Sequence, residues 1–359
     1  MISGGGTGGH IYPAISIAQA LQAMLKETEI LFVGAKGKME MQKVPESGFK
    51  IVGLWISGLQ RKLTIGNLLF PVKVIFSVIR SYFLIKRYRP DAVVGVGGYA
   101  SGPLLFVANK AGVPTLIQEQ NSYAGLTNKW LSKNANKICV AYPEMDRYFP
   151  AGKIVVTGNP VRDGLVLAQN AKTEAYQFFG FSQEKKTLLI LGGSLGARTI
   201  NESVLKDVSK LMEAGVQVIW QTGAFYFDEM KQRLGEIPKD LRMMPFLKEM
   251  QFGYGVADVV ISRAGALSIA ELMETGKPSV LVPSPNVAED HQTKNAMALV
   301  KREAAWIVTD RNSKDQLILK ALELLSDTGA QQVLSENIKG MAFKEASKSI
   351  AKEVIALIK

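Results

Sequence analysis

The strongest chemical signal is a glycine-rich turn near the N-terminus, in the segment ISGGGTGGHIYPAISIAQAL (2–21). The turn leads into apolar residues at helical spacing, and backbone N–H groups at a helix start attract phosphate. Gly4, Gly6 and Gly9 also fit the dinucleotide-binding spacing, whose confirming feature is an acid at the end of the next strand. That strand ends in FVGAKGK (32–38), without an acid, so a nicotinamide or flavin cofactor is not expected.

His10 follows the last glycine and is one of two histidines in the chain. The helix dipole disfavours the imidazolium form there, so the ring is expected to be neutral at about pH 7 and able to accept a proton. A second glycine segment, GVGGYASGP (95–103), follows another expected strand. Because open parallel sheets bind ligands at the carboxyl ends of neighbouring strands, the two loops predict an anion-binding cradle. A tight turn without a ligand, and a histidine that only caps its helix, are the alternatives.

The second half has its own glycine turn, LGGSLGAR (191–198), in which Ser194 adds a hydroxyl to the backbone donors. In SRAGALSIAEL (262–272), Glu271 lies six residues after Gly265, about one and a half turns into the next helix. A carboxylate there can accept both hydroxyls of a ribose, although a solvated glutamate on a helix face is the commoner case.

Two further groups of polar residues complete the candidate site. His291 and Gln292 lie where a loop enters a helix in NVAEDHQTKNA (286–296), a position suited to reading sugar hydroxyls. Arg162, in GNPVR at the expected domain join, could neutralise a diphosphate.

The elements that must position these residues are short Val- and Ile-rich runs alternating with helical patterns, as in parallel sheets built from βαβ units. Strands are expected at 30–34, 91–97, 113–118, 137–141 and 153–158, and at 187–193, 216–220, 258–262, 278–283 and 304–308. We therefore predict an α/β fold with two Rossmann-like, doubly wound domains facing a cleft. The expected domains are 1–160 and 161–337, with the segment 338–359 forming a last helix (338–358) that returns to the first domain.

The composition argues against a disulfide-stabilised, metal-binding or membrane-spanning protein. A single cysteine, Cys139, leaves no internal disulfide, and no cysteine or histidine cluster has metal-site spacing. No signal peptide or transmembrane helix is expected, since the longest charge-free apolar run (92–109) reads as strand, loop and helix. The first strand, Met1-Ile2-Ser3, is short, and we expect the native start a few residues upstream.

The net charge of +11 is concentrated in the first half, where residues 1–159 hold 18 Lys and Arg against 8 Asp and Glu. Residues 47–90 have no acid; their basic residues are Lys50, Arg61, Lys62, Lys73, Arg80, Lys86, Arg87 and Arg89. Among them lie the apolar residues Leu68, Leu69, Phe70, Val74, Ile75, Phe76, Ile79, Phe83 and Leu84. An apolar stripe with cationic flanks suits an anionic bilayer surface. At least half of these apolar residues are expected to pack in the core instead, and no nucleic-acid-binding motif is present.

Taken together, these segments resemble the MurG family of peptidoglycan glycosyltransferases. GGGTGGHIYPA, GVGGYASGP, QEQNSYAGLTNKWL, TGNPVR, LGGSLGAR, SRAGALSIAEL and DHQTKNA occur in the family's order, over about residues 3–296. The resemblance implies the two-domain GT-B fold and inverting transfer of N-acetylglucosamine from UDP-N-acetylglucosamine to the 4-hydroxyl of the muramyl sugar of lipid I, giving lipid II. It also implies a peripheral protein on the cytoplasmic face of the plasma membrane, with the undecaprenyl-linked acceptor as a partner and cell-wall or division proteins as further candidates.

The resemblance also implies residue roles. His10 is the expected general base, with Glu119 second. The donor would be bound by Thr7, Gly8, Gly9, Asn121, Arg162, Gly193, Ser194, Leu247 (against the base, in MPFLKEM, 244–250), Ala266, Leu267, Ser268, Glu271, His291 and Gln292. The acceptor diphosphate would lie against Gly5, Gly6, His10, Gly97, Gly98, Tyr99 and Ser101. No tightly bound cofactor or protein metal is expected; stimulation by a divalent cation is left open, and domain closure is expected.

This chain departs from the family pattern at two points. Gln118 stands where many members have a histidine before EQN, and His291 stands where some have glutamine, so the sugar contact is better supported for Gln292. The rival functions are a glycolipid synthase with a diacylglycerol acceptor, a UDP-sugar 2-epimerase, a non-catalytic nucleotide-sugar or lipid-diphosphate binding protein and, least favoured, a nicotinamide oxidoreductase.

Overall fold

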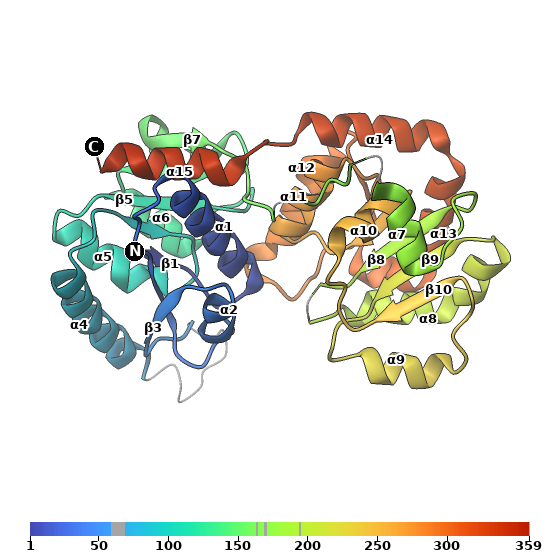
Figure 1. Cartoon of the computed structure of the whole chain (residues 1–359), viewed down its shortest axis with the longest axis horizontal. Helices are drawn as coiled ribbons and strands as arrows, with labels where there is room; N and C mark the ends of the chain where they lie inside the picture. The colour runs from blue at the N-terminus through green and yellow to red at the C-terminus, as the bar shows by residue number, and fades with distance from the viewer. Residues whose placement is uncertain (59–68, 163, 169–170, 194, 359) are drawn as a thin grey trace. The chain divides into compact units, whose positions relative to one another are not determined.

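The computed structural model describes residues 1–58, 69–162, 164–168, 171–193 and 195–358 (Figure 1). Four residues of the analysis above, Arg61, Lys62, Leu68 and Ser194, lie outside this range. The chain divides into two compact units, Met1–Arg162 with Phe343–Lys359, and Asp163–Ala342. These limits fall a few residues beyond the boundaries of 160 and 337 expected from the sequence.

The first unit is a parallel sheet in the order β3-β2-β1-β4-β5-β6-β7 with helices on both faces (Figure 1). Its strands are β1 (Ile2–Ser3), β2 (Leu31–Ala35), β3 (Lys50–Leu54), β4 (Val93–Gly95), β5 (Thr115–Glu119), β6 (Lys137–Val140) and β7 (Ile154–Val156). Its helices are α1 (Gly8–Met24), α2 (Glu40–Glu46), α4 (Phe70–Tyr88), α5 (Ser101–Lys110), α6 (Leu126–Ser132) and α15 (Ala346–Leu357). Neighbouring strand residues alternate between the two faces: Phe32 packs with α1 and α15, and Val33 packs with α4 and α5.

The second unit repeats this plan with the order β10-β9-β8-β11-β12-β13. Its strands are β8 (Thr187–Leu191), β9 (Gln217–Gln221), β10 (Leu241–Met244), β11 (Val259–Ser262), β12 (Ser279–Leu281) and β13 (Trp306–Ile307). Its helices are α7 (Lys172–Phe179), α8 (Arg198–Glu213), α9 (Phe227–Leu234), α10 (Met250–Val256), α11 (Ala266–Thr275), α12 (His291–Val300), α13 (Ser313–Ser326) and α14 (Thr328–Gly340). Both orders place the first strand centrally, beside the fourth, which is the dinucleotide-fold arrangement. The prediction of two Rossmann-like domains is confirmed.

The prediction for the C-terminal helix is partly wrong. Ile338 belongs to α14, which ends at Gly340, and the returning helix α15 begins only at Ala346. Glu345, immediately before α15, adopts a left-handed backbone conformation (φ +57°), which separates the two helices. The return itself is as expected, because Ile350, Ala351 and Val354 of α15 share a core with α1.

Helix α4 packs through a narrow face of small and large side chains, in which Ser77, Ser81, Leu84 and Ile85 are buried. The Ser77 hydroxyl donates to the Trp55 carbonyl at 3.1 Å. The other large apolar side chains are mostly exposed, and Leu69, Val72, Ile75, Phe76, Ile79, Tyr82 and Phe83 form what we call the α4 face. The expectation that at least half of the stretch packs in the core is therefore wrong: of its described members, Leu84 alone is fully buried, and Phe70 and Val74 are half-buried.

Lys277, between α11 and β12, is a buried cation whose Nζ donates to the Ala257 carbonyl at 2.6 Å. Burial lowers the pKa of Lys277 from 10.5 to about 8. Below the lower value the lysine is charged in the folded and the unfolded chain, so folding carries the full cost of burying the charge. As pH rises from 8 to 10.5, the folded form loses its proton before the unfolded form does. The free energy of unfolding therefore rises over this window, by about 3 kcal/mol in total.

We therefore expect Lys277→Met to raise the stability of the second unit at about pH 7, with a gain that shrinks as the pH rises through this window. Chemical denaturation of both proteins at several pH values measures the difference, and Lys301→Met, at an exposed position of the same unit, is a control. A gain that does not change with pH would contradict the assignment.

Candidate active site

The two glycine loops of the first unit touch each other at the carboxyl ends of β1 and β4. A Cβ atom at Gly98 would lie 2.4 Å from the Gly5 carbonyl oxygen, and one at Gly97 would lie 2.8 Å from Cδ2 of His10. Both Gly97 and Gly98 also have positive φ angles, +88° and +79°, which disfavour any other residue. The expected cradle is thus formed by backbone in direct contact, at the point where the strand order reverses.

His10 lies in the first turn of α1, as predicted, and is half-buried. Its Nδ1 atom lies 3.2 Å from the Thr7 hydroxyl oxygen, an arrangement that fixes the ring. The opposite edge of the ring faces Gly97, where a Cβ would come within 3.0 Å of Nε2. His10 therefore joins the two loops, and Thr7, Gly8 and Gly9 begin the helix whose first N–H groups lack intrahelical acceptors.

Tyr99 and Ser101 hold the second loop. The Ser101 hydroxyl donates to the Gly98 carbonyl at 2.8 Å. The Tyr99 ring covers Gly6, where a Cβ would be 3.1 Å from the ring. Burial, and secondarily the charge of Glu40, raise the pKa of the Tyr99 hydroxyl, which remains a hydrogen-bond donor at neutral pH.

Glu40, the first residue of α2, was not among the sequence candidates. Its side chain is 0% exposed and accepts hydrogen bonds from the backbone N–H of Ala35 at 3.0 Å and of Gly6 at 3.1 Å. An acid thus does reach the end of β2, but from the following helix, and its oxygens face the glycine loop. Because this carboxylate is buried and both of its oxygens already accept backbone N–H groups, it is not placed to accept ribose hydroxyls, and the nicotinamide alternative stays disfavoured.

Glu119, the second candidate base, has a different role in this structure. Its carboxylate is 2% exposed. One oxygen accepts from the backbone and side-chain N–H groups of Asn121, at 3.1 and 3.2 Å. The other accepts from Gly125 N–H at 3.0 Å and Asn128 Nδ2 at 2.9 Å. The carboxylate holds the loop from 120 to 128 and orients Asn121, which favours His10 over Glu119 as the base.

Gln118, which replaces the family's histidine, belongs to a buried amide network. Its Nε2 donates to Asn159 Oδ1 at 3.0 Å, and Asn159 Nδ2 donates to the Gln120 carbonyl at 2.9 Å. Gln120 Nε2 in turn donates to Gln118 Oε1 and to the Val96 carbonyl. The network ties β5 to the GNP segment, so Gln118 acts here as a structural residue.

In the second unit, Gln221 at the end of β9 joins two predicted donor loops. Its Nε2 donates to the Gly193 carbonyl at 3.1 Å, and its Oε1 accepts from the Leu247 backbone N–H at 2.9 Å. The Leu247 side chain is 1% exposed and packs toward Gly253. It therefore anchors the loop that is predicted to lie beside the nucleotide base. Gln221 could not be singled out from the sequence, because a glutamine that ends a buried strand belongs to no motif.

Glu271 projects from α11 and is half-buried, and Ala266, Leu267 and Ser268 form the first turn of this helix. The Tyr254 hydroxyl, from α10, donates to Glu271 Oε2 at 3.1 Å. Tyr254 is otherwise buried. Tyr254, a third residue that the sequence did not reveal, therefore orients the predicted ribose-binding carboxylate.

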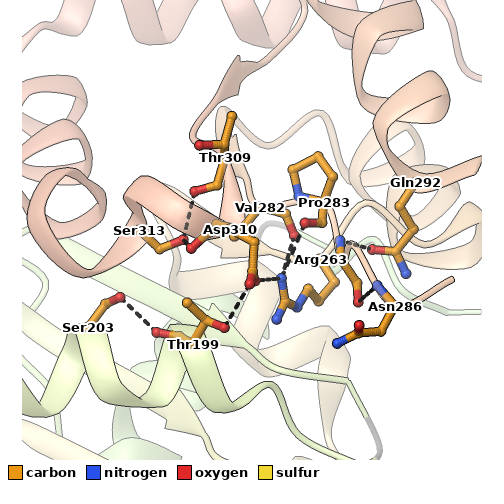
Figure 2. A network of polar contacts seen from close by, with 11 residues as sticks. Thr199, Ser203, Arg263, Val282, Pro283, Asn286, Gln292, Thr309, Asp310 and Ser313 are labelled. Carbon is orange, nitrogen blue, oxygen red and sulfur yellow. Dashed lines mark hydrogen bonds and ion pairs between the residues drawn. The ribbon is translucent and has the colours of Figure 1, made fainter. Parts of the chain in front are cut away.

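Arg263 anchors the loops around the predicted sugar-binding residues (Figure 2). Its Nη1 donates to Asp310 at 2.5 Å and to the carbonyl of Val282 at 3.2 Å. Gln292, at the start of α12, uses its Oε1 to accept from the Ser284 backbone N–H at 2.8 Å. His291 precedes it and is also half-buried. The β12–α12 loop is thus held at both ends, and the Gln292 side-chain amide group is the part suited to donating to a sugar.

Arg162 is the last residue of the first unit and is exposed, and its role at the diphosphate stays a prediction. Across the ranges described above, we find no cluster of three or more His, Cys, Asp and Glu side chains placed to hold a metal ion. Nor does any helix in that part of the chain have the length and apolarity needed to span a membrane.

Comparisons with known proteins agree with this geometry. Residues 1–140 match the N-terminal domain of glycosyltransferase family 28, and residues 187–354 match its C-terminal domain. A protein from Cytophaga hutchinsonii named UDP-N-acetylglucosamine--N-acetylmuramyl-(pentapeptide) pyrophosphoryl-undecaprenol N-acetylglucosamine transferase is 54% identical, over 100% of this chain and 96% of its own length. A protein of the same name from Flavobacterium psychrophilum is 49% identical, over 100% and 97%.

The crystal structure of Acinetobacter baumannii MurG superimposes with a TM-score of 0.79 at 27% identity, covering 99% of both chains. A putative UDP-N-acetylglucosamine 2-epimerase from Listeria monocytogenes shares the fold, with a TM-score of 0.69 at 14% identity. The chain groups with the transferases and not with the epimerase, because it is 49–54% identical to the named transferases over its full length and both family domains match. The chain therefore belongs to the MurG family of UDP-sugar hexosyltransferases, within glycosyltransferase family 28.

Proposed function

We propose that this protein transfers N-acetylglucosamine from UDP-N-acetylglucosamine to the muramyl sugar of undecaprenyl-linked lipid I, forming lipid II. The observation that carries the proposal is the cradle of two touching glycine loops joined by His10, in a chain 54% identical to a transferase of that name. Backbone amides at a helix start suit the acceptor diphosphate, and the histidine between the loops suits the removal of a proton beside it.

In the proposed reaction the 4-hydroxyl of the muramyl sugar attacks the anomeric carbon of the donor as UDP leaves from the opposite face. His10 takes the hydroxyl proton. Negative charge develops on the departing diphosphate, where the backbone donors at 193–196 and the Arg162 guanidinium would stabilise it. Gln221 fixes the Gly193 carbonyl at the start of this segment through its Nε2.

The proposal is tested with radiolabelled UDP-N-acetylglucosamine, a short-chain lipid I analogue and a diacylglycerol control. Labelled disaccharide-lipid from the first acceptor alone is expected. Transfer only to diacylglycerol would make the chain a glycolipid synthase. Release of free sugar as its 2-epimer, or donor binding without turnover, would favour the epimerase or the binding-protein alternative.

We also propose that the α4 face rests on an anionic membrane surface, at the cytoplasmic side of the plasma membrane where the acceptor would be presented. Support comes from large exposed side chains, with Phe83 61% and Phe76 57% exposed. Phe76 stacks edge-on against Trp55, and Lys73 Nζ lies 5.9 Å from the Trp55 ring centroid. Arg80 and Arg87 are exposed on the same helix, so an apolar surface is flanked by cations.

Replacing Arg80 and Arg87 together by serine is expected to weaken binding to phosphatidylglycerol vesicles by about 10–30-fold, since each basic residue near the headgroups contributes about 1 kcal/mol. The loss should shrink at high salt. Lys26→Ser with Lys110→Ser, two substitutions outside α4 in the same unit, is a charge-matched control. Equal binding by both double variants would contradict this orientation.

A further inference from the structure

We propose that Glu40 is a positioning residue for the acceptor loop: its buried carboxylate fastens the Gly6 amide and so fixes how the glycine loop presents its other N–H groups. The inference rests on the proposed function, because it assigns the acceptor diphosphate to this loop. It starts from an unusual location for a charged side chain, which is seldom fully buried unless its polar atoms are paired.

The carboxylate bridges two segments that are far apart in the sequence. Oε1 accepts from the Ala35 N–H at the end of β2, and Oε2 accepts from the Gly6 N–H in the loop after β1. Both bonds use backbone donors, so they fix the path of the main chain rather than a side chain. Because the end of β2 is part of the sheet, the bridge ties the loop to a rigid reference point.

The surrounding glycines leave room for this carboxylate. A Cβ at Gly5 would lie 2.1 Å from Glu40 Oε1, and a Cβ at Gly34 would lie 2.6 Å from its Cγ. Gly5 does not have a positive φ angle, so the need for glycine there comes from the carboxylate and not from the backbone conformation. Gly5 of the loop and Gly34 of β2 are thus explained by a protein side chain instead of a ligand.

The Glu40 bridge also determines which backbone N–H groups of the loop can bind an anion. The Gly6 N–H points to Glu40 and is not available to an anion in this arrangement. The N–H groups of Gly8 and Gly9 begin α1, in the same turn as His10, and have no acceptor within the helix. Glu40 therefore favours anion binding at the helix start, beside the base, over binding deeper in the loop.

The test compares Glu40→Gln, Glu40→Asp and, as a matched control on the same helix, the exposed Glu46→Gln. A glutamine amide can accept only one of the two N–H groups, and aspartate keeps the charge but is too short to span both. Each Glu40 variant is expected to raise the KM for a short-chain lipid I analogue about tenfold. The affinity for UDP should be unchanged within about twofold, because Gly193, Leu247 and Glu271, the residues expected on the nucleotide side, belong to the second unit. Glu46→Gln should change neither value.

A double-mutant cycle adds a readout that general destabilisation would not reproduce. Gly5→Ala should be harmful in the natural background, and much less so when combined with Glu40→Ala, which opens the space. Additive effects, equal losses in acceptor KM and in UDP affinity, or a lower acceptor KM in Glu40→Gln would overturn the proposal.

Binding of a short-chain isoprenyl diphosphate, measured by calorimetry, separates this inference from the proposed function. Wild-type binding that weakens about tenfold in Glu40→Gln, without any sugar transfer, would sustain the positioning role and reject the function. Sugar transfer by the wild type, together with unchanged diphosphate binding in Glu40→Gln, would support the function and reject the positioning role.

Discussion

Replacing His10 by alanine is expected to lower kcat by about 10²–10⁴-fold, the usual range for a general base. The structure supports this residue over Glu119, because Glu119 is buried with four N–H donors on its two oxygens. His10, by contrast, is half-buried between the two loops, and its Nδ1 is fixed by Thr7. Steady-state kinetics at saturating concentrations of both substrates measure the effect.

Two controls separate chemistry from binding and folding. UDP affinity and the thermal midpoint of the His10→Ala protein should match those of the natural protein, since Gly193, Leu247 and Glu271, the residues expected on the nucleotide side, belong to the second unit. The acid limb of the kcat–pH profile should disappear in the variant. A fall in kcat of less than about tenfold, or a change confined to the acceptor KM, would make His10 a substrate contact rather than the base.

Glu271→Ala is expected to raise the KM for UDP-N-acetylglucosamine about 10²-fold, because both ribose hydroxyls would lose their charge-assisted hydrogen bonds to the Glu271 carboxylate. The position of Glu271 on α11 and its hydrogen bond from Tyr254 support this assignment. Tyr254→Phe removes only the orienting hydroxyl and should have a smaller effect of the same kind, about three- to tenfold.

The 2′-deoxyribose form of the donor tests the contact itself. The natural protein should prefer the ribose form by about tenfold or more, and Glu271→Ala should lose that preference. If the alanine variant keeps the full preference, Glu271 is a helix-face residue and another group binds the ribose.

The strands buried on both faces were predictable, because their Val- and Ile-rich runs carry a strong signal. Strands β3 and β10 were missed, and each lies at an edge of its sheet. β3 reads KIVGL and is mostly half-buried, while β10 reads LRMM and carries an arginine. Edge strands need less apolar surface, so their sequences resemble loops. For the same reason Met244 was assigned to the base-side loop, whereas it ends β10.

The motif residues of the candidate site were also predictable, but the residues that hold them in place were not. The sequence pointed to His10, Gly97 and Gly98, and the structure brings them together. Glu40, Gln221 and Tyr254 act on these motifs from other elements, through contacts that depend on the tertiary fold. The burial of α4 was misjudged because only a narrow face of the helix, with Ser77, Ser81, Leu84 and Ile85, is buried, while hydrophobicity alone assigns all its large apolar side chains to the core.

The most direct test of the central claim is the structure of the product. We would incubate the protein with UDP-N-acetylglucosamine and a short-chain lipid I analogue, purify the lipid product and determine its new glycosidic linkage by NMR. Inverting transfer to the muramyl 4-hydroxyl predicts a single β-1,4-linked disaccharide. An α linkage, attachment at another hydroxyl, or recovery of the unmodified acceptor with UDP still bound to the protein would contradict the account.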